Sequence, residues 1–128
     1  NWSAGITGLY FSRQYARGNE NNQHQAGTFT DRFGGTRTFL GSGEVPGYSI
    51  VNLRTSYRAG KNLEIFGRVN NLFDKKYFSA GALGENPFNA AGTFQTNSDD
   101  WTRETFFAPG TPRGIWVGLR YEFAPPAP

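Results

Sequence analysis

Few residues of this chain have the types and spacing that catalysis or metal binding requires. The sequence of 128 residues contains one histidine, His24, and no cysteine. It therefore cannot form a disulfide, and it cannot form a zinc site built from several His or Cys ligands. The acids at 99–100 and Glu104 could offer oxygen ligands to Ca²⁺, although adjacent acids in a polar loop are usually solvated. Glycine-rich stretches at 34–36 and 81–84 lack the lysine and the following helix of a phosphate-binding loop. We therefore expect no enzymatic activity, no cofactor and no bound metal.

The composition favours strands over helices. Hydrophobic residues form 37% of the chain, aromatic residues form 16%, and 17 glycines and 7 prolines would interrupt a long helix. No apolar run approaches the roughly 18 residues that a membrane-spanning helix needs. The 13 Lys and Arg residues are spread from Arg13 to Arg120 instead of forming a patch, which argues against nucleic acid as a partner.

Four segments alternate between apolar and polar residues with the two-residue period of a β-strand, at about 2–15, 48–57, 62–73 and 113–123. The last segment has one wholly apolar face, which consists of Ile115, Val117, Leu119, Tyr121 and Phe123. The charged side chains of the strands all fall on the opposite face. For that second face we predict Asn52, Arg54, Glu64, Arg68, Arg120 and Glu122.

Two connections between these segments are unusually long. Residues 58–62 form a short hairpin turn, whereas the loops at about 16–47 and 79–112 are rich in Gly, Asn, Thr, Ser and aromatic residues. Connections beyond about 12–15 residues are uncommon inside compact domains. Long loops at one end and short turns at the other, on strands of about 9–11 residues, are typical of an outer-membrane β-barrel. A Pro-rich tail at 124–128 cannot extend the last strand.

The distribution of charge agrees with a barrel wall. A sheet can cross hydrocarbon only as a closed barrel, because every backbone N–H and C=O must be paired there. Arg or Lys on the lipid face costs about 2–4 kcal/mol at the midplane, whereas a charge in the lumen meets water. Four strands cannot close such a barrel, so we expect a fragment of one. A soluble β-sandwich or lipocalin-like barrel with one wet face is the alternative, since it also produces alternation.

A specific motif follows the third segment. It reads Asn-Asn-Leu-Phe-Asp-Lys-Lys-Tyr at 70–77, and after a long loop come Pro112-Arg113 and a final strand that ends in an aromatic residue. With the runs 48–57 and 112–123, this motif resembles the C-terminal end of TonB-dependent outer-membrane receptors. The plainer interpretation of 70–74 is a local turn, because Asn and Asp bond to their own backbone.

The resemblance implies an antiparallel up-and-down transmembrane barrel of 22 strands in the bacterial outer membrane. Residues 1–123 would supply its last four strands and two long extracellular loops. The family takes up scarce nutrients, most commonly ferric siderophores, with energy from the TonB complex, which would act through a plug region missing from this chain. Haem, cobalamin, nickel chelates and sugars use the same scaffold. A passive porin or another outer-membrane barrel remains the alternative, with outer-membrane lipid as its surroundings in either case.

In this family the extracellular loops would take part in ligand capture. Both loops combine aromatic rings with guanidinium groups, which suit anionic, aromatic iron chelates through cation–π contacts and bidentate hydrogen bonds. The candidate ligand-binding residues are Arg32, Arg37, Trp101, Arg103, Phe106 and Phe107. The alternative is that the rings pack the loops upon themselves, since a long loop needs a small core to be ordered.

The last segment has a second implied role. Its apolar residues Ile115, Val117, Leu119, Tyr121 and Phe123 resemble the C-terminal signal that the barrel-assembly machinery reads, by strand addition at a sheet edge. In the family the aromatic residue is normally the last of the chain, whereas here 124–128 follow Phe123. The same side chains would also simply face lipid.

Overall fold

The computed structural model describes residues 1–123, which are built of β-strands with no α-helix. The all-β class predicted from the sequence is confirmed, and the sheets of the described residues do not close into a barrel. No helix in this range is long and apolar enough to cross a membrane. The chain divides into two compact units, which we call the sheet unit and the loop unit.

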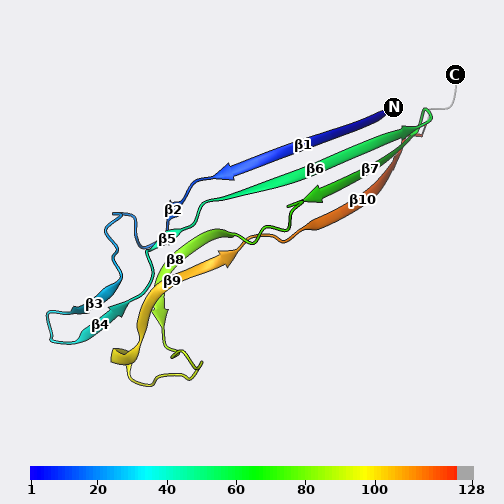
Figure 1. Ribbon diagram of the computed structural model, residues 1–128. Coiled ribbons are helices and arrows are strands. Elements are labelled where there is room, and N and C mark those ends of the chain that lie inside the picture. The colour runs from blue at the N-terminus through cyan, green and yellow to red at the C-terminus, as the bar shows by residue number, and fades with distance from the viewer. Residues whose placement is uncertain (124–128) are drawn as a thin grey trace. The chain divides into compact units, whose positions relative to one another are not determined.

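The sheet unit contains residues 1–11, 48–77 and the described residues from Thr111 onward. Its four strands are β1 (Trp2–Phe11), β6 (Tyr48–Ala59), β7 (Leu63–Asn70) and β10 (Gly114–Tyr121). They form one antiparallel sheet in the order β1-β6-β7-β10, and Figure 1 labels these four strands. Compared with the prediction, β1 ends at Phe11 instead of near residue 15, and β7 ends at Asn70 instead of near residue 73.

The register places a continuous set of apolar residues from all four strands on one face. Ile6 pairs with Leu53, Leu53 with Val69, and Val69 with Ile115. Residues that pair directly across strands have their side chains on the same face. This apolar face is uncovered, since Ile6 is 74% exposed, Val117 77% and Leu119 70%.

The motif at 70–77 begins at the last residue of β7 and bonds to residues 111–113, which precede β10. Asn71 is 2% exposed, accepts the Lys75 N–H at 2.9 Å through Oδ1, and donates through Nδ2 to the carbonyls of Lys75 and Thr111. The Asn71 N–H donates to Asn52 Oδ1 at 2.9 Å. Asn71 has a φ of +50°, a left-handed conformation that Asn tolerates better than most residues, and this explains why β7 stops there.

Two further residues of the motif stabilise the same junction. Asp74 Oδ1 accepts the Arg113 N–H at 2.9 Å, and the Tyr77 hydroxyl accepts the Thr111 N–H at 3.2 Å. The Tyr77 ring lies 4.3 Å from the ring of Tyr48, between centroids. These bonds support the interpretation of 70–74 as a turn, and they explain the spacing of the motif by its contacts with 111–113.

The loop unit contains residues 12–47 and 78–110. Its strands are β2 (Gln14–Tyr15), β3 (Gly27–Thr30), β4 (Thr36–Phe39), β5 (Glu44–Val45), β8 (Phe78–Asn86) and β9 (Thr102–Pro109). One sheet has the order β3-β4-β9-β8, and β2 pairs with β5. All pairs are antiparallel except β4 with β9, which are parallel through Thr38–Thr102 and Phe39–Arg103. The two segments predicted as long loops therefore carry sheet of their own (Figure 1).

A small buried centre orders the loop unit. Ala16 is 1% exposed, Val45 3% and Asn19 2%. Asn19 donates through Nδ2 to the Gly43 carbonyl at 3.1 Å and accepts the His24 N–H through Oδ1 at 2.9 Å. Gly43 has a φ of +68°, and a Cβ there would lie 2.9 Å from His24 Cδ2, so only glycine fits. Asn19 thus holds the backbone at His24, and the absence of a side chain at Gly43 leaves room for the imidazole.

Candidate functional site

The polar face of the sheet unit contains a cleft of about 680 Å³. One row across the four strands consists of Gly5, Arg54, Arg68 and Trp116, which pair in that order. All four line the cleft, together with Phe66. Its volume lies within the roughly 300–1,000 Å³ of small-molecule sites. The cleft thus combines two guanidinium groups with two aromatic rings.

Small residues allow the large side chains of this face to lie flat on the sheet. A Cβ at Gly5 would approach Arg54 Nε to 2.8 Å, so the Arg54 side chain occupies the space above that glycine. The indole of Trp116 lies over Gly114 in the same way, and the ring of Phe66 over Gly118. Gly5 lines the cleft itself, and Gly114 and Gly118 leave room for the two aromatic rings that line it.

Two arginines of the cleft lie directly opposite each other on adjacent strands. Arg54 pairs with Arg68, and like charges at such positions repel. Arg68 Nε donates to Asn70 Oδ1 at 2.8 Å. Neither guanidinium forms an ion pair with a carboxylate of residues 1–123. The row is therefore a positively charged strip.

The residues predicted for the lumen face share this side of the sheet. The register places Asn52, Arg54, Glu64, Arg68 and Arg120 on the face opposite the apolar one. Glu122 follows the end of β10, and its carboxylate lies 3.5 Å from Arg120 Nη2 in an exposed ion pair. Asn52 is committed to the Asn71 backbone. That this face borders a lumen stays a prediction.

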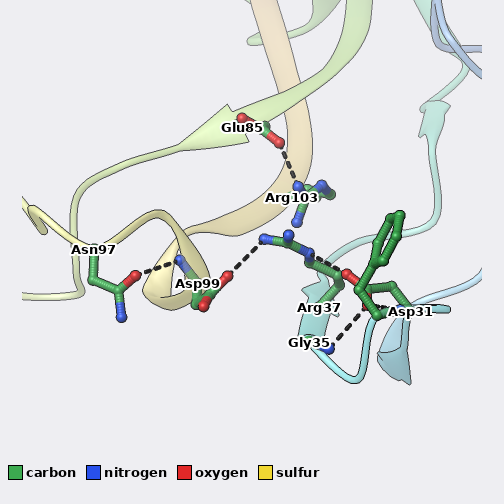
Figure 2. Close-up of polar contacts among 8 residues, drawn as sticks. Asp31, Gly35, Arg37, Glu85, Asn97, Asp99 and Arg103 are labelled. Atoms are coloured by element: carbon green, nitrogen blue, oxygen red, sulfur yellow. Dashed lines mark hydrogen bonds and ion pairs between the residues drawn. The ribbon is translucent and has the colours of Figure 1, made fainter.

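In the loop unit, Arg37 links two segments instead of facing an open site. Its Nε lies 3.3 Å from Asp31 Oδ2, and its Nη1 lies 3.2 Å from Asp99 Oδ1 (Figure 2). Asp99 belongs to the 3₁₀ turn η1 (Ser98–Asp100), whose first residues are capped by the Asn97 side chain. Arg37 thus ties the 31–37 turn to the 97–100 turn.

The carboxylate of Asp31 is held in its ionised form. It accepts the N–H of Gly35 at 2.9 Å and a hydrogen bond from Arg37 Nε (Figure 2). It also accepts the N–H of Phe33 at 2.8 Å. These hydrogen bonds lower the pKa of Asp31 below its usual value, and the bond from the Gly35 N–H has a larger effect than the bond from the Phe33 N–H.

Arg103 lies between a carboxylate and an aromatic ring. Its Nη2 pairs with Glu85 across β8 and β9 (Figure 2), and its guanidinium carbon lies 5.7 Å from the Phe39 ring centroid. Arg103, Glu85, Phe39 and His24 line a cleft of about 210 Å³. Of the six residues predicted to bind ligand, Arg103 lines this cleft.

The other ligand candidates have separate local partners. Arg32 lies over the Phe33 ring at 4.7 Å, and Trp101 Nε1 donates to the Gln95 carbonyl at 2.8 Å. Phe107 stacks on Phe78 with centroids 4.5 Å apart, and Phe106 covers Gly84. These contacts support the packing alternative for the rings, and a ligand-binding role for any of the six stays a prediction.

Two of the three acids considered for Ca²⁺ are engaged with protein groups. Asp99 pairs with Arg37, and Glu104 accepts a hydrogen bond from Asn86. Among residues 1–123 no group of three His, Asp or Glu side chains is placed to hold a metal ion. The geometry therefore offers no support for a Ca²⁺ site at 99–104.

Within residues 1–123 the final strand, β10, pairs with β7 along one edge and has no partner along the other. Of the residues predicted as an assembly signal, Ile115 is 67% exposed, Tyr121 56% and Phe123 86%. The tail at 124–128 lies outside the described residues.

Several residues of these clefts are not recognisable as site residues from the sequence. Phe66 and Trp116 share the parity of the charged residues, and that signal could have placed them on the polar face. His24, Glu85 and Phe39 come together only through the loop-unit fold.

Comparison with known protein families, with curated proteins and with solved structures finds no match to this chain.

Proposed function

We propose that this chain is the C-terminal barrel portion of a TonB-dependent outer-membrane receptor, with a ferric siderophore as the nutrient it takes up. The observation that supports the proposal is the register of the sheet unit. It places apolar side chains of all four strands on one open face and the strand charges on the other. A wall between lipid and a watery lumen needs this arrangement.

The open edges of the sheet support a barrel with more strands. β1 and β10 each lack a partner on one side within residues 1–123. Unpaired strand edges cannot lie in hydrocarbon, because each unsatisfied backbone group costs several kcal/mol. As the last four strands of a 22-stranded barrel, β1 would pair with the preceding strand, and β10 would pair with the first strand.

The motif at 70–77 supports a receptor over a passive porin, because the resemblance to TonB-dependent receptors depends on it. In this proposal the loop unit is extracellular, and the TonB complex acts through a plug region outside this chain. The barrel-assembly machinery recognises β10, and outer-membrane lipid covers the apolar face.

Two other functions make different demands on the structure. A passive porin shares the barrel wall and needs no plug. A soluble β-barrel module requires another element to cover the apolar face, where Ile6 and Val117 are 74% and 77% exposed. The apolar face therefore favours a membrane protein.

The test uses the full-length protein in its own outer membrane. We expect expression under iron limitation, uptake of labelled ferric siderophore that disappears when TonB is deleted, and heat-modifiable migration of the detergent-extracted protein. Uptake that persists without TonB would indicate a porin. Recovery of the protein in the aqueous fraction without detergent would indicate the soluble module.

A further inference from the structure

The polar face of the sheet unit carries two different arrangements of charge. Near the hairpin turn, Glu64 on β7 pairs directly with Arg58 on β6 and with Arg120 on β10, so opposite charges meet. Two rows further along the same face, Arg54 pairs with Arg68 instead. Like charges directly opposite each other destabilise a sheet, and proteins break such local rules mainly at functional sites. The second row therefore indicates a bound anion, for which residues 1–123 offer no carboxylate at ion-pair distance.

The two guanidinium groups of this row are accessible from the cleft of the polar face. Arg54 and Arg68 are both exposed residues, and both line the cleft. Arg68 donates through Nε to Asn70 Oδ1 at 2.8 Å, and this is the one hydrogen bond that either guanidinium forms within residues 1–123. The terminal nitrogens of both arginines are therefore free to donate. The planar fork of a guanidinium suits the oxygens of an oxyanion.

Aromatic rings line the other side of the same cleft. The ring of Phe66 lies over Gly118 and the indole of Trp116 lies over Gly114, so both rings cover β10. Phe66 is 42% exposed and Trp116 is 49% exposed, although both lie on the polar face. Aromatic rings pair favourably with other rings in offset-stacked or edge-to-face arrangements. The cleft thus has a cationic side on β6 and β7 and an aromatic side over β10.

The two sides together indicate the chemistry of the ligand. An inorganic anion would bind the arginines but leave both rings exposed, and a neutral aromatic compound would leave the two charges unbalanced. The volume of about 680 Å³ is enough to enclose a whole small molecule. Ser3 and Ser56 also line the cleft, and their hydroxyls, 2.8 Å apart, add neutral hydrogen-bonding groups. A planar ring that carries an oxyanion matches both sides.

We propose that this cleft binds a small aromatic compound with an oxyanion group. Arg54 and Arg68 donate to the oxyanion, and Trp116 and Phe66 contact the ring. All residues that line the cleft belong to the sheet unit, so the site is separate from the six ligand candidates of the loop unit. As a binding step for cargo inside a barrel, the site rests on the proposed function. Binding itself does not require transport.

The test measures binding of naphthoate to the full-length protein in detergent by isothermal titration calorimetry, with empty micelles as the blank. Naphthamide, the neutral amide of the same ring, is the matched probe. We expect naphthoate to bind more tightly, because only its carboxylate forms charge-assisted hydrogen bonds with the arginines. Equal affinity for both probes would overturn the proposal. Absence of naphthoate binding above the blank would overturn it too, and this would also be the result if another part of the protein covered this face.

Arg54→Gln and Arg68→Gln each remove one charge from the cleft. We expect naphthoate binding about tenfold weaker in each variant, with naphthamide binding unchanged. Arg54→Gln also removes the repulsion between the opposed charges, so its midpoint of thermal unfolding should be unchanged or higher, which separates binding from folding. Arg58→Gln is the matched control, because Arg58 lies on the same strand and face but outside the cleft, and it should leave naphthoate binding unchanged.

Trp116→Leu tests the aromatic side of the cleft. It removes a ring and leaves both charges in place, so we expect weaker binding of naphthoate and naphthamide alike. No loss in both cleft arginine variants, an equal loss in Arg58→Gln, or unchanged affinity for both probes in Trp116→Leu would each overturn the proposal. TonB-dependent uptake is scored separately, so failure of the receptor function and failure of this site are distinguishable.

Discussion

At Asn71 a left-handed backbone coincides with a side chain whose bonds join three parts of the sheet unit. Asn71→Ala leaves the Lys75 N–H and the Thr111 carbonyl without their partner, at a cost of about 1–3 kcal/mol for each group that water does not reach. We expect a lower midpoint of thermal unfolding of the full-length protein, followed by heat-modifiable gel migration.

Asn22→Ala is the control for the backbone contribution. Asn22 has a φ of +59°, close to the +50° of Asn71, but it is exposed. The strain of placing Ala in the left-handed region is therefore shared by both variants. Equal losses in the two would show that the bonds of Asn71 add nothing to stability.

The Asp31 turn should respond to acid in a defined direction. Its pKa is lower in the fold than the ordinary value of 3.8, chiefly because the Gly35 and Phe33 N–H groups bond to the carboxylate. Such a carboxyl stabilises the fold fully above its unfolded pKa, and the contribution is lost as the pH falls through the folded pKa. We expect the Gly35 amide NMR signal to stay constant at neutral pH and to shift in acid, with a midpoint below the ordinary value of 3.8.

Substitution checks that Asp31 causes this shift. Asp31→Asn removes the titrating group and should abolish the acid response at Gly35, whereas Asp100→Asn should leave it intact. An unchanged acid shift in Asp31→Asn would assign the response to another group.

At the scale of the strand, neighbouring residues of β1 test which face meets lipid. Ile6 lies on the apolar face opposite Leu53, and Thr7 lies on the polar face opposite Asn52. Arg on the lipid face costs about 2–4 kcal/mol near the midplane and little in a watery lumen. We expect Ile6→Arg to reduce the yield of folded full-length protein in the outer membrane, with Thr7→Arg close to wild type. The reverse order would contradict the face assignment.

The long strands were predictable because a strand with one apolar and one polar face has a two-residue period. β10 shows this plainly, with Ile115, Val117 and Leu119 alternating with Trp116 and Gly118. β8 has no such signal, since Ala80, Gly81, Ala82 and Gly84 supply small residues to both faces. Its pairing with β9 depends on residues about twenty positions away, which a local pattern does not report.

The site was less accessible to sequence reasoning than the strands. Arg103 was identified by its type, but its partner Glu85 and the ring of Phe39 come from different strands of the loop unit. His24 lies in a polar stretch that carries no period, and its place depends on Asn19 and Gly43. Side chains that meet through non-local pairing leave no spacing signal in the chain.

For the whole molecule, the two units differ in what stabilises them. The loop unit has a buried centre at Ala16, Asn19 and Val45. The sheet unit has no covered apolar face and presents the free edges of β1 and β10, which are templates for pairing with other chains. The described residues of the sheet unit therefore leave both its apolar face and its two outer edges open.

This difference predicts how the 128-residue chain behaves when it is expressed alone. In plain buffer we expect it to aggregate, because the apolar face and both edges associate with other copies. In detergent micelles we expect a soluble species with the circular dichroism of β-sheet. Replacing Ile6, Val117 and Leu119 together by Thr should reduce the aggregation, since these three side chains are among the most exposed on the apolar face. A monomer with a sharp unfolding transition in plain buffer would contradict the membrane assignment, because a self-sufficient domain has no need of lipid on that face.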